Sequence, residues 1–459
     1  MAKKINILGA TGSIGRSALD VVSRHPGEWQ VGVLAAGSRA EELAAACEAC
    51  GAEAAVLADE SKLPELQAAL KARGLSTRAA AGEAACCEAA SDPEADAVLL
   101  AASGAAGLPQ AFAAAKAGKR MLLANKESVV CGGALLQQAI REGGAELLPV
   151  DSEHSAIFQS LAAATPAQRE KAVIWLTCSG GPFLRRMDLT GVTVEEASTH
   201  PRWKMGRKIT VDSATLMNKA LEVIEARWLF DIPPERIRVV IHPQSILHSG
   251  VAFEDGAVMA ELGVPDMRTP IAVAMAWPER TESGAAALDF TKLKEPLTFE
   301  APDLERFPQL KLAWEALEAG GSATIVLNAA NEAAVAAFLD RKISFLGIGR
   351  ACREALSGLV LPAPKSLSDI YAADREARSF VDSLIYEDQM KDIFAELGVA
   401  SDSDGEYNFI TLGEYASQVG ADLKNISADQ VAVVYADGAI VDGEGFGKEI
   451  YGNTLAATL

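Results

Sequence analysis

Short apolar runs alternate with alanine-rich amphipathic stretches along the first third of the chain. Runs of strand length occur at residues 5–8, 30–35, 98–100 and 120–124, with polar or glycine-containing segments between them. Strands that alternate with helical stretches are typical of βαβ units, in which helices cover both faces of a parallel sheet. We therefore predict a doubly wound α/β domain in this part of the chain.

Later apolar runs predict a second sheet, followed by a helical region. The strands of this sheet are expected at residues 172–177, 238–241, 251–253 and 258–261. Helical patterns then cover residues 309–358 and 366–385. This order of elements indicates an α/β protein with two sheets and a helical region after them.

A glycine-rich turn follows the first strand directly. Its sequence, Gly9-Ala10-Thr11-Gly12-Ser13-Ile14-Gly15, has the spacing G-x-x-G-x-x-G rather than the commoner G-x-G-x-x-G. The backbone N–H groups that begin the next helix can hold a pyrophosphate at such a turn. The position after the first strand makes the pattern more specific than the glycines alone.

The end of the second strand indicates which dinucleotide binds. An NAD site would favour an acidic residue there to hold the ribose 2′-hydroxyl. This chain instead has Gly37, Ser38 and Arg39. A serine and an arginine suit a 2′-phosphate, so we favour NADP over NAD. The alternative is a doubly wound domain that binds another nucleotide.

Two carboxylates follow a later apolar strand. Residues 147–150 lead into Asp151-Ser152-Glu153-His154. Carboxylates at positions i and i+2 suit Mg²⁺ or Mn²⁺, which prefer oxygen ligands. The alternative, compatible with the first, is a helix N-cap at Asp151 or Ser152. His154 has no partner that the sequence reveals, and we interpret it as structural.

Lys126 and Ser179 each come shortly after a predicted strand, within Asn125-Lys126-Glu127 and Ser179-Gly180-Gly181 respectively. Polar residues beyond the carboxyl ends of parallel strands lie where α/β folds bind ligands. A surface lysine is the alternative for Lys126. The turn at Ser179 offers a hydroxyl and amides to an anion, and it lacks the G-x-S-x-G spacing of a hydrolase.

The stretch from His200 to Glu222 concentrates polar groups that a protein core would exclude. We predict that it begins with a loop, which contains Trp203 and Met205 and ends at Gly206. A short strand is expected at residues 208–211.

After this strand the pattern predicts a helix, with Asp212 or Ser213 capping the free N–H groups of its first turn. Four polar residues would share one face of it, namely Thr215, Asn218, Lys219 and Glu222. Hydroxyl, amide and ammonium groups there suit a phosphate, whereas Glu222 fits such a site only if a metal ion lies between it and the ligand. The alternative is a solvated helix face with a Lys219–Glu222 ion pair.

The composition limits the classes of partner. The 459 residues carry a net charge of −20, which argues against nucleic acid or an anionic membrane but not against a small anion at a local basic site. No apolar run reaches the roughly 18 residues that span a bilayer. The seven cysteines lack disulfide spacing, and the single C-x-x-C at Cys47 and Cys50 is poor evidence for zinc. We therefore expect a reducing, cytoplasmic compartment.

Seven segments between Lys4 and about Ile385 together resemble one enzyme family. They are GATGSIG, ANKES, PVDSEHSAIFQ, SGGPF, HPRWKMGRKITVDSATLMNKALEVIEA, HPQSI and LNAANE. Their order and spacing are similar to those of 1-deoxy-D-xylulose 5-phosphate reductoisomerase. The resemblance implies NADPH- and divalent-metal-dependent rearrangement and reduction of this sugar phosphate to 2-C-methyl-D-erythritol 4-phosphate, a step in isoprenoid precursor biosynthesis. It also implies a homodimer.

The resemblance further implies a role for each candidate residue. NADPH would contact Thr11, Gly12, Ser13, Ile14, Gly37, Ser38, Arg39, Asn125, Glu127 and Gly206. Substrate would contact Lys126, Ser152, Glu153, Ser179, His200, Ser213, Asn218, Lys219 and Glu222. The metal ion, Mg²⁺, Mn²⁺ or Co²⁺, would bind Asp151, Glu153 and Glu222. The catalytic set would be these three carboxylates with Lys126, His200 and Trp203, and the loop bearing Trp203 would close over the substrate.

We divide the chain into an NADPH-binding domain at residues 1–150, a metal and substrate domain at 151–290, a linker and helical domain at 291–385 and an acidic tail at 386–459. The tail has 3 Lys or Arg against 14 Asp or Glu, a net charge of −11.

The tail resembles an internal fragment of a protease IV type signal peptide peptidase, with a strand expected at residues 431–435 and no Ser/Lys pair after it. We interpret it as a partly ordered fusion scar or mis-joined sequence, and the alternative is a purposeful extra module. Two other functions stay open for the whole chain. They are a metal-free NADP dehydrogenase and a non-catalytic chimera.

Overall fold

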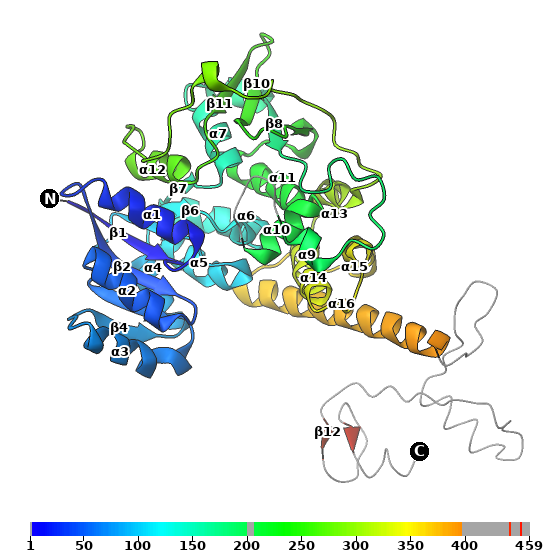
Figure 1. The fold of residues 1–459 in the computed structure, drawn as a ribbon, viewed down its shortest axis with the longest axis horizontal. Helices are drawn as coiled ribbons and strands as arrows, with labels where there is room; N and C mark the ends of the chain where they lie inside the picture. The colour runs from blue at the N-terminus through cyan, green and yellow to red at the C-terminus, as the bar shows by residue number, and fades with distance from the viewer. Residues whose placement is uncertain (1, 200–205, 397–439, 442–449, 452–459) are drawn as a thin grey trace, which may run out of the picture. The chain divides into compact units, whose positions relative to one another are not determined.

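The computed structural model describes residues 2–199, 206–396, 440–441 and 450–451. The chain separates into two compact units, Met1–Ile385 and Tyr386–Leu459. Figure 1 shows the elements of the first unit in chain order.

The first sheet is a seven-stranded parallel sheet that confirms the doubly wound prediction. Its strands are β1 Lys3–Leu8, β2 Trp29–Ala36, β3 Ala54–Leu57, β4 Arg78–Ala81, β5 Ala97–Leu100, β6 Arg120–Leu123 and β7 Glu146–Pro149. Their order is β4-β3-β2-β1-β5-β6-β7. The chain winds outward in opposite directions from β1 and β5, and the crevice at such a switch point is where open α/β sheets bind ligands.

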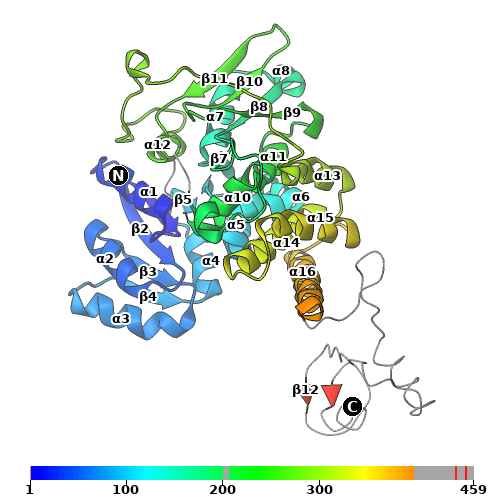
Figure 2. The same cartoon turned by 45° about the vertical axis from the view of Figure 1, so that its right-hand side comes forward.

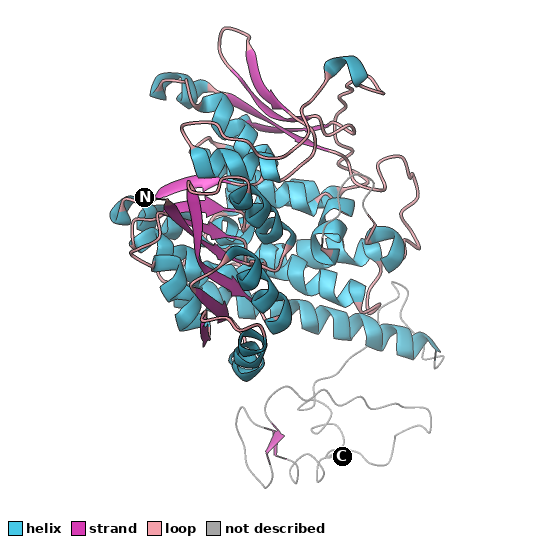
Figure 3. Ribbon diagram, turned by 60° about the vertical axis from the view of Figure 1, so that its left-hand side comes forward, coloured by secondary structure: helices cyan, strands magenta, loops and turns pink. Residues whose placement is uncertain are grey.

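Helices cover both faces of this sheet, as Figure 3 shows. One face carries α1 Ser13–Ser23, α2 Ala40–Cys50, α3 Leu63–Ala72 and, from much later in the chain, α12 Arg268–Ala276. The other face carries α4 Glu83–Ser91, α5 Leu108–Lys116 and α6 Lys126–Gly143. Arg268 binds Asp20 of α1 at 2.9 Å, so the second half of the chain is tied to the first sheet.

The second sheet contains four strands, and its prediction is confirmed. The strands are β8 Val173–Cys178, β9 Ile237–Ile241, β10 Leu247–Ala252 and β11 Val258–Leu262, in the order β11-β10-β8-β9. Two helices, α7 Ser152–Leu161 and α11 Met217–Phe230, pack against this sheet, and Figure 2 shows α7 beside it. Two short helices, α8 Pro166–Lys171 and α9 Val194–Ala197, precede and follow β8.

The helical region after the second sheet is also confirmed. It consists of α13 Leu312–Ala319, α14 Ala323–Leu339, α15 Phe345–Gly358 and α16 Leu367–Glu396. Short 3-10 helices occur at Glu60–Lys62, Gly104–Gly107, Pro234–Arg236, Phe290–Lys292 and Pro308–Lys311. Helix α16 continues past residue 385, where we expected it to end. Val381 and Ile385 are buried in the same core as α11 and α14.

One element prediction is wrong. Residues 208–211 do not form a strand but belong to helix α10 Arg207–Ala214. The predicted cap at Asp212 or Ser213 is also wrong, because both residues lie inside α10. Helix α11 begins instead after Leu216, whose backbone is left-handed with φ 60° and which caps no N–H group with its side chain.

In the second unit the structure describes β12 Ile440–Val441 and β13 Ile450–Tyr451, which pair in parallel. The strand expected at residues 431–435 lies outside the described residues. None of the helices in the described part of the chain combines the length and the apolar character needed to cross a bilayer.

Candidate active site

The glycine turn lies at the carboxyl end of β1, at the switch point of the first sheet. Gly9 has a φ of +93°, and a Cβ there would overlap the carbonyl group of Ala101 after β5. Gly12 is the N-cap of α1, and no described side chain caps this helix. The first N–H groups of α1 are therefore available to an anion, as the sequence predicted. Thr11 is buried beside this turn, and Ser13 and Ile14 begin the helix.

The three residues expected near the adenosine end follow β2 and are exposed. Arg39 is the N-cap residue of α2, and its Nη1 lies 3.1 Å from Oε2 of Glu42. The same oxygen accepts a hydrogen bond of 2.6 Å from Arg16 of α1. Two guanidinium groups thus meet at the edge of the crevice, and a 2′-phosphate can compete with Glu42 for them.

Asn125 and Glu127 lie at the carboxyl end of β6, where the N-terminus of α6 begins. Asn125 caps α6 by accepting a hydrogen bond of 2.9 Å from the N–H of Ser128. Its Nδ2 donates to the carbonyls of Ala102 at 2.6 Å and Gly104 at 3.0 Å. Gly206 is the N-cap of α10 and is exposed.

Lys126 is the centre of a buried cluster of charges. Its Nζ lies 3.0 Å from Oδ2 of Asp151, 2.9 Å from Oδ1 of Asn218 and 2.8 Å from Oε1 of Glu222. Burial disfavours its ammonium form, but the carboxylates of Asp151 and Glu222 outweigh burial and hold its pKa well above the usual value. The surface-lysine interpretation is therefore wrong, since only 8% of the Lys126 side chain is exposed.

Lys219 is a second buried ammonium, on α11. It forms an ion pair with Glu222 one helical turn away, and its Nζ lies 3.4 Å from Oε1 of Glu153. Its side chain is 3% exposed, so the solvated-face interpretation of this ion pair is wrong. Burial is again outweighed, here by Glu153 and Glu222, which raise the pKa of Lys219.

The three carboxylates expected to bind metal converge from two helices. Oxygen atoms of Asp151, Glu153 and Glu222 all lie within 4.8 Å of one another. Asp151 also caps α7, where its Oδ1 accepts from the N–H of Glu153 at 3.2 Å. The N-cap interpretation is therefore confirmed, and the metal interpretation stays a prediction with which this geometry is compatible. Burial raises the pKa of Glu153 to about 7, while Lys126 and His154 outweigh burial at Asp151 and hold its pKa well below the usual value.

The donor set fits a hard divalent cation. Asp151, Glu153 and Glu222 supply several oxygen atoms. The side chains of Asp151 and Glu153 are partly exposed, whereas that of Glu222 is 1% exposed. Ser152 lies at the same edge and donates from its Oγ to Oε2 of Glu153 at 2.7 Å. Mg²⁺ and Mn²⁺ take such carboxylates together with oxygens of the substrate.

His154 and Glu225 form a second layer behind these carboxylates, and our reading of the sequence missed it. His154 is fully buried, and its Nδ1 lies 3.3 Å from Oδ1 of Asp151 and 3.1 Å from Oε2 of Glu225. Its Nε2 is 3.0 Å from the carbonyl oxygen of Glu222. These partners were not evident from the sequence, and the interpretation of His154 as structural stays a prediction. Spacing was the available signal, because His154 stands three positions after Asp151 and Glu225 stands three positions after Glu222.

The Ser179-Gly180-Gly181 turn packs against the end of α10. Gly181 has a φ of +69°, and a Cβ there would overlap the carbonyl of Ser213. This packing brings the turn that bears Ser179 to Ser213, which α10 places just before Asn218 and Lys219 on α11. Thr215 is the C-cap of α10 rather than part of the α11 face. His200, Trp203 and Met205 lie outside the described residues.

Comparisons with known proteins test the resemblance. Three family models match, described as 1-deoxy-D-xylulose 5-phosphate reductoisomerase at residues 5–133, its C-terminal domain at 147–230 and DXP reductoisomerase C-terminal domain at 262–380. The 1-deoxy-D-xylulose 5-phosphate reductoisomerase of Janthinobacterium sp. (strain Marseille) is 51% identical over 388 residues, 83% of this chain and 99% of that protein. That of Pseudomonas syringae pv. syringae is 53% identical over 385 residues, 82% of this chain and 96% of that protein.

This chain belongs to the 1-deoxy-D-xylulose 5-phosphate reductoisomerase family.

Solved structures agree with this assignment. The 1-deoxy-D-xylulose 5-phosphate reductoisomerase from Zymomonas mobilis in complex with NADPH has a TM-score of 0.78 and 47% identity, covering 84% of this chain and 99% of that one. A DOX-P reductoisomerase in complex with NADPH, fosmidomycin and magnesium has a TM-score of 0.79 and 40% identity, covering 84% and 98%. The resemblance of residues 4–385 to a reductoisomerase is confirmed, and that of the tail to a peptidase stays a prediction.

Proposed function

We propose that this site performs the reductoisomerase reaction in this chain. NADPH and a divalent cation would support the rearrangement of 1-deoxy-D-xylulose 5-phosphate and its reduction to 2-C-methyl-D-erythritol 4-phosphate. The observation that carries the proposal is the convergence of three carboxylates on two buried lysines, Lys126 and Lys219. Relatives with the same fold have been crystallised with NADPH and with magnesium.

Asp151, Glu153 and Glu222 would hold the cation. When bound, Mg²⁺, Mn²⁺ or Co²⁺ supplies Lewis acidity to a ketone oxygen and an adjacent hydroxyl. The side chain of Glu153 is 21% exposed, so substrate oxygens could reach a cation held by these three carboxylates. The three carboxylates alone would leave excess negative charge, and the two lysines offset it.

Lys126 would act as a hydrogen-bond donor and positive charge rather than as a base. The carboxylates of Asp151 and Glu222 raise its pKa and so favour the protonated form of Nζ. An ammonium placed in a buried site stabilises negative charge on a substrate oxygen without reorganisation. Lys126 also lies between the proposed cofactor residues Asn125 and Glu127, so a substrate oxygen bound to it would lie beside the cofactor site.

The substrate phosphate would bind between the Ser179 turn and the start of α11. Ser179, Ser213, Asn218 and Lys219 supply hydroxyl, amide and ammonium donors, which suit phosphate oxygens. Glu153 and Glu222 raise the pKa of Lys219 and so favour its protonated form. Contacts to the phosphate, away from the reacting carbons, would orient the substrate for the rearrangement.

The proposal extends to assembly and compartment. Val258 and Met259 are 56% and 55% exposed on β11, the edge strand of the second sheet. Exposed apolar side chains on an edge strand favour pairing with another chain, which supports a homodimer. All seven cysteines are free thiols, which supports a reducing, cytoplasmic compartment. Light scattering at several concentrations would test the dimer, and a monomer throughout would contradict it.

Analysis of the product separates this function from its alternatives. Incubation with 1-deoxy-D-xylulose 5-phosphate, NADPH and Mn²⁺ should give a branched 2-C-methyl polyol phosphate, detected by NMR as a methyl singlet on a carbon that bears a hydroxyl group and no hydrogen. A metal-free dehydrogenase would give an unbranched polyol phosphate. Formation of the unbranched polyol phosphate, or of no product by a folded chain, would contradict the proposal.

A further inference from the structure

The carboxylate of Glu127 is held from two sides, by two different parts of the chain. Its Oε2 lies 3.1 Å from Nδ2 of Asn125 at the start of α6, and this NH2 group shares its two hydrogens among Glu127 and the carbonyls of Ala102 and Gly104. Its Oε1 accepts a hydrogen bond of 3.1 Å from Nζ of Lys208, in the first turn of α10 and 81 positions later. The Glu127 side chain is 13% exposed, so these two donors occupy most of its surroundings.

Lys208 is itself fixed by residues of α10 and α14. Its Nζ lies 2.9 Å from Oδ2 of Asp212 one turn along α10. The other oxygen of Asp212 accepts a hydrogen bond of 2.9 Å from Nδ2 of Asn331. Asn331 is fully buried on α14, in the segment LNAANE that the substrate and metal sites leave without a role. A single line of polar contacts therefore connects α14 to Glu127.

The same series of polar contacts continues to the carboxyl ends of β1 and β5, where the winding direction of the sheet changes. Asn125 donates to the carbonyl groups of Ala102 and Gly104, which belong to the segment after β5. This segment packs against the glycine turn, since a Cβ on Gly9 would overlap Ala101. Helix α14 thus reaches the cofactor side of the molecule through side chains that are mostly buried.

The charges of this line depend on one another. Burial favours the protonated form of Glu127, but Lys208 outweighs burial, and the pKa of Glu127 lies below its usual value. Burial likewise disfavours the ammonium of Lys208, but Asp212 and Glu127 outweigh it and raise the pKa of Lys208. Removal of either ion would leave its partner buried with fewer compensating contacts.

We propose that Lys208 is a positioning residue for the cofactor, which orients Glu127 through the contact line Asn331–Asp212–Lys208–Glu127. This proposal rests on the proposed function, in which Asn125 and Glu127 contact NADPH. Lys208 holds one oxygen of Glu127 in place, so the remaining lone pairs of the carboxylate would be able to accept from hydroxyl or amide donors of NADPH. Asn331 acts at a distance, because it fixes Asp212 and therefore the position of the Lys208 ammonium.

The test measures NADPH binding to the full chain by the change in NADPH fluorescence. Lys208→Met should weaken NADPH binding roughly tenfold, the loss typical of a hydrogen bond between charged groups. The KM for NADPH should rise by a similar factor, while the KM for 1-deoxy-D-xylulose 5-phosphate stays unchanged. In a Glu127→Gln background, Lys208→Met should have little further effect, because the two residues act as a unit.

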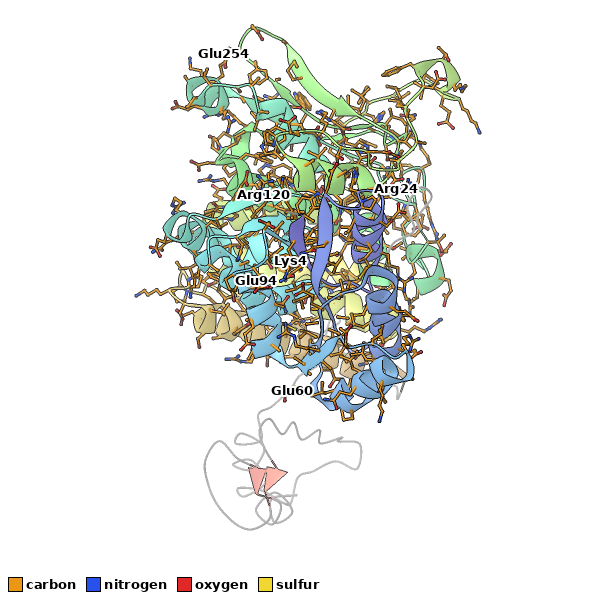
Figure 4. All side chains as sticks on the ribbon, turned by 90° about the vertical axis from the view of Figure 1, so that its left-hand side faces the viewer. Lys4, Arg24, Glu60, Glu94, Arg120 and Glu254 are labelled. Atoms are coloured by element: carbon orange, nitrogen blue, oxygen red, sulfur yellow. The ribbon has the colours of Figure 1, made fainter. Side chains whose placement is uncertain are left out.

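Lys4→Met is the matched control. Lys4 also lies between two carboxylates, with its Nζ 2.9 Å from Glu53 and 2.9 Å from Glu94, but at the opposite end of the first sheet. Figure 4 shows Lys4 close to Glu94. The control removes the same ammonium and should leave NADPH binding unchanged.

Four outcomes would overturn the proposal. A folded Lys208→Met variant that binds NADPH as the unaltered chain does would overturn it, as would an equal loss in Lys4→Met. An undiminished loss in the Glu127→Gln background would show that Lys208 acts independently of Glu127. Should Lys208→Met not fold, Asn331→Leu is expected to weaken NADPH binding severalfold, and unchanged binding in that variant would overturn the proposal. If the unaltered chain binds no NADPH, the proposed function itself fails.

Discussion

Individual residues of the site differ in how far their spacing in the sequence identifies them. Asp151 and Glu153 follow an apolar strand at positions i and i+2, and both lie in the carboxylate cluster. His154 and Glu225 belong to the same cluster. Each stands three positions after a predicted metal ligand, but only the fold reveals their contact, which joins α7 to α11 across about 70 positions. Sequence spacing thus identifies groups on one element, whereas pairs between elements require the fold.

Glu222→Gln tests the metal site at this scale. The variant should lose metal-supported turnover by roughly a thousandfold, because Lewis-acid stabilisation is worth several kcal/mol. NADPH binding should stay close to that of the unaltered chain, since the proposed role of Glu222 is to hold the metal ion and not the cofactor. Measurement of Mn²⁺ binding by electron paramagnetic resonance gives a readout independent of activity.

The control for this variant is Glu254→Gln, at an exposed Glu254–Lys171 ion pair. It makes the same chemical change and should alter neither Mn²⁺ binding nor turnover. Normal Mn²⁺-supported activity in Glu222→Gln would refute the assignment of Glu222 as a metal ligand.

His248 predicts how stability depends on pH. Burial lowers the pKa of His248 to about 4, against about 6.5 for an exposed histidine. Below pH 6.5 the unfolded chain binds a proton that the folded chain does not, so stability falls as the pH decreases from about 6.5 to 4. The full effect of this one residue is about 3 kcal/mol.

His248→Gln should therefore reduce the slope of the free energy of unfolding against pH between pH 4 and 6.5. Urea denaturation at several pH values measures this slope. The two curves should run parallel above pH 7, and an unchanged slope at acidic pH would show that His248 does not titrate as proposed.

At the scale of elements, the main error concerns α10. The run Lys208–Val211 contains β-branched residues and looks like a strand, but Thr210, Val211 and Asp212 are buried on a helix. Tertiary packing and the Lys208–Asp212 ion pair override the local preference. The long periodic helices and the parallel strands were predictable because their apolar patterns extend over the whole element.

The turn at Gly181 gives a test of how the elements fit together. Gly181→Ala should push this turn away from Ser213 and raise the KM for 1-deoxy-D-xylulose 5-phosphate roughly tenfold, because the turn would supply part of the phosphate site. The KM for NADPH should stay the same, since the turn proposed to bind the cofactor follows β1 of the first sheet, whereas Gly181 follows β8 of the second.

Gly191→Ala provides the comparison. Gly191 has a similar left-handed φ of +67°, but no atom lies within 4 Å of its added Cβ. The two variants share the backbone strain and differ in the overlap. An equal change in substrate KM in both variants would mean that strain, rather than contact with Ser213, determines the effect.

At the scale of the whole molecule, the sequence shows that the chain changes in composition near residue 385, but it does not explain why. The structure divides at Ile385, and the family models end at residue 380. The tail carries −11 of the net charge of −20. The division of residues 1–385 into three domains stays a proposal, and α12 shows why sequence order is a poor guide there, since it packs on the first sheet.

Truncation tests the boundary. A chain that ends at Ile385 should keep its turnover number and melt at a temperature no lower than the full chain, because every residue of the proposed site precedes that point. A chain that ends at Arg375 should be less stable. It would lack Val381 and Ile385 from the core and Arg378, which binds Glu332 of α14 at 2.5 Å. Loss of activity in the longer truncation would show that the tail supports the catalytic unit.

The central claim is that the chain is a metal- and NADPH-dependent reductoisomerase. Oxidation of NADPH, followed by absorbance after addition of 1-deoxy-D-xylulose 5-phosphate, tests it most directly when the assay is run with Mn²⁺ and again with a chelator. We predict steady oxidation with Mn²⁺, none with the chelator, and recovery when excess Mn²⁺ is restored. Oxidation that continues at the same rate in the chelator, or no oxidation by a folded chain that binds NADPH, would contradict the account.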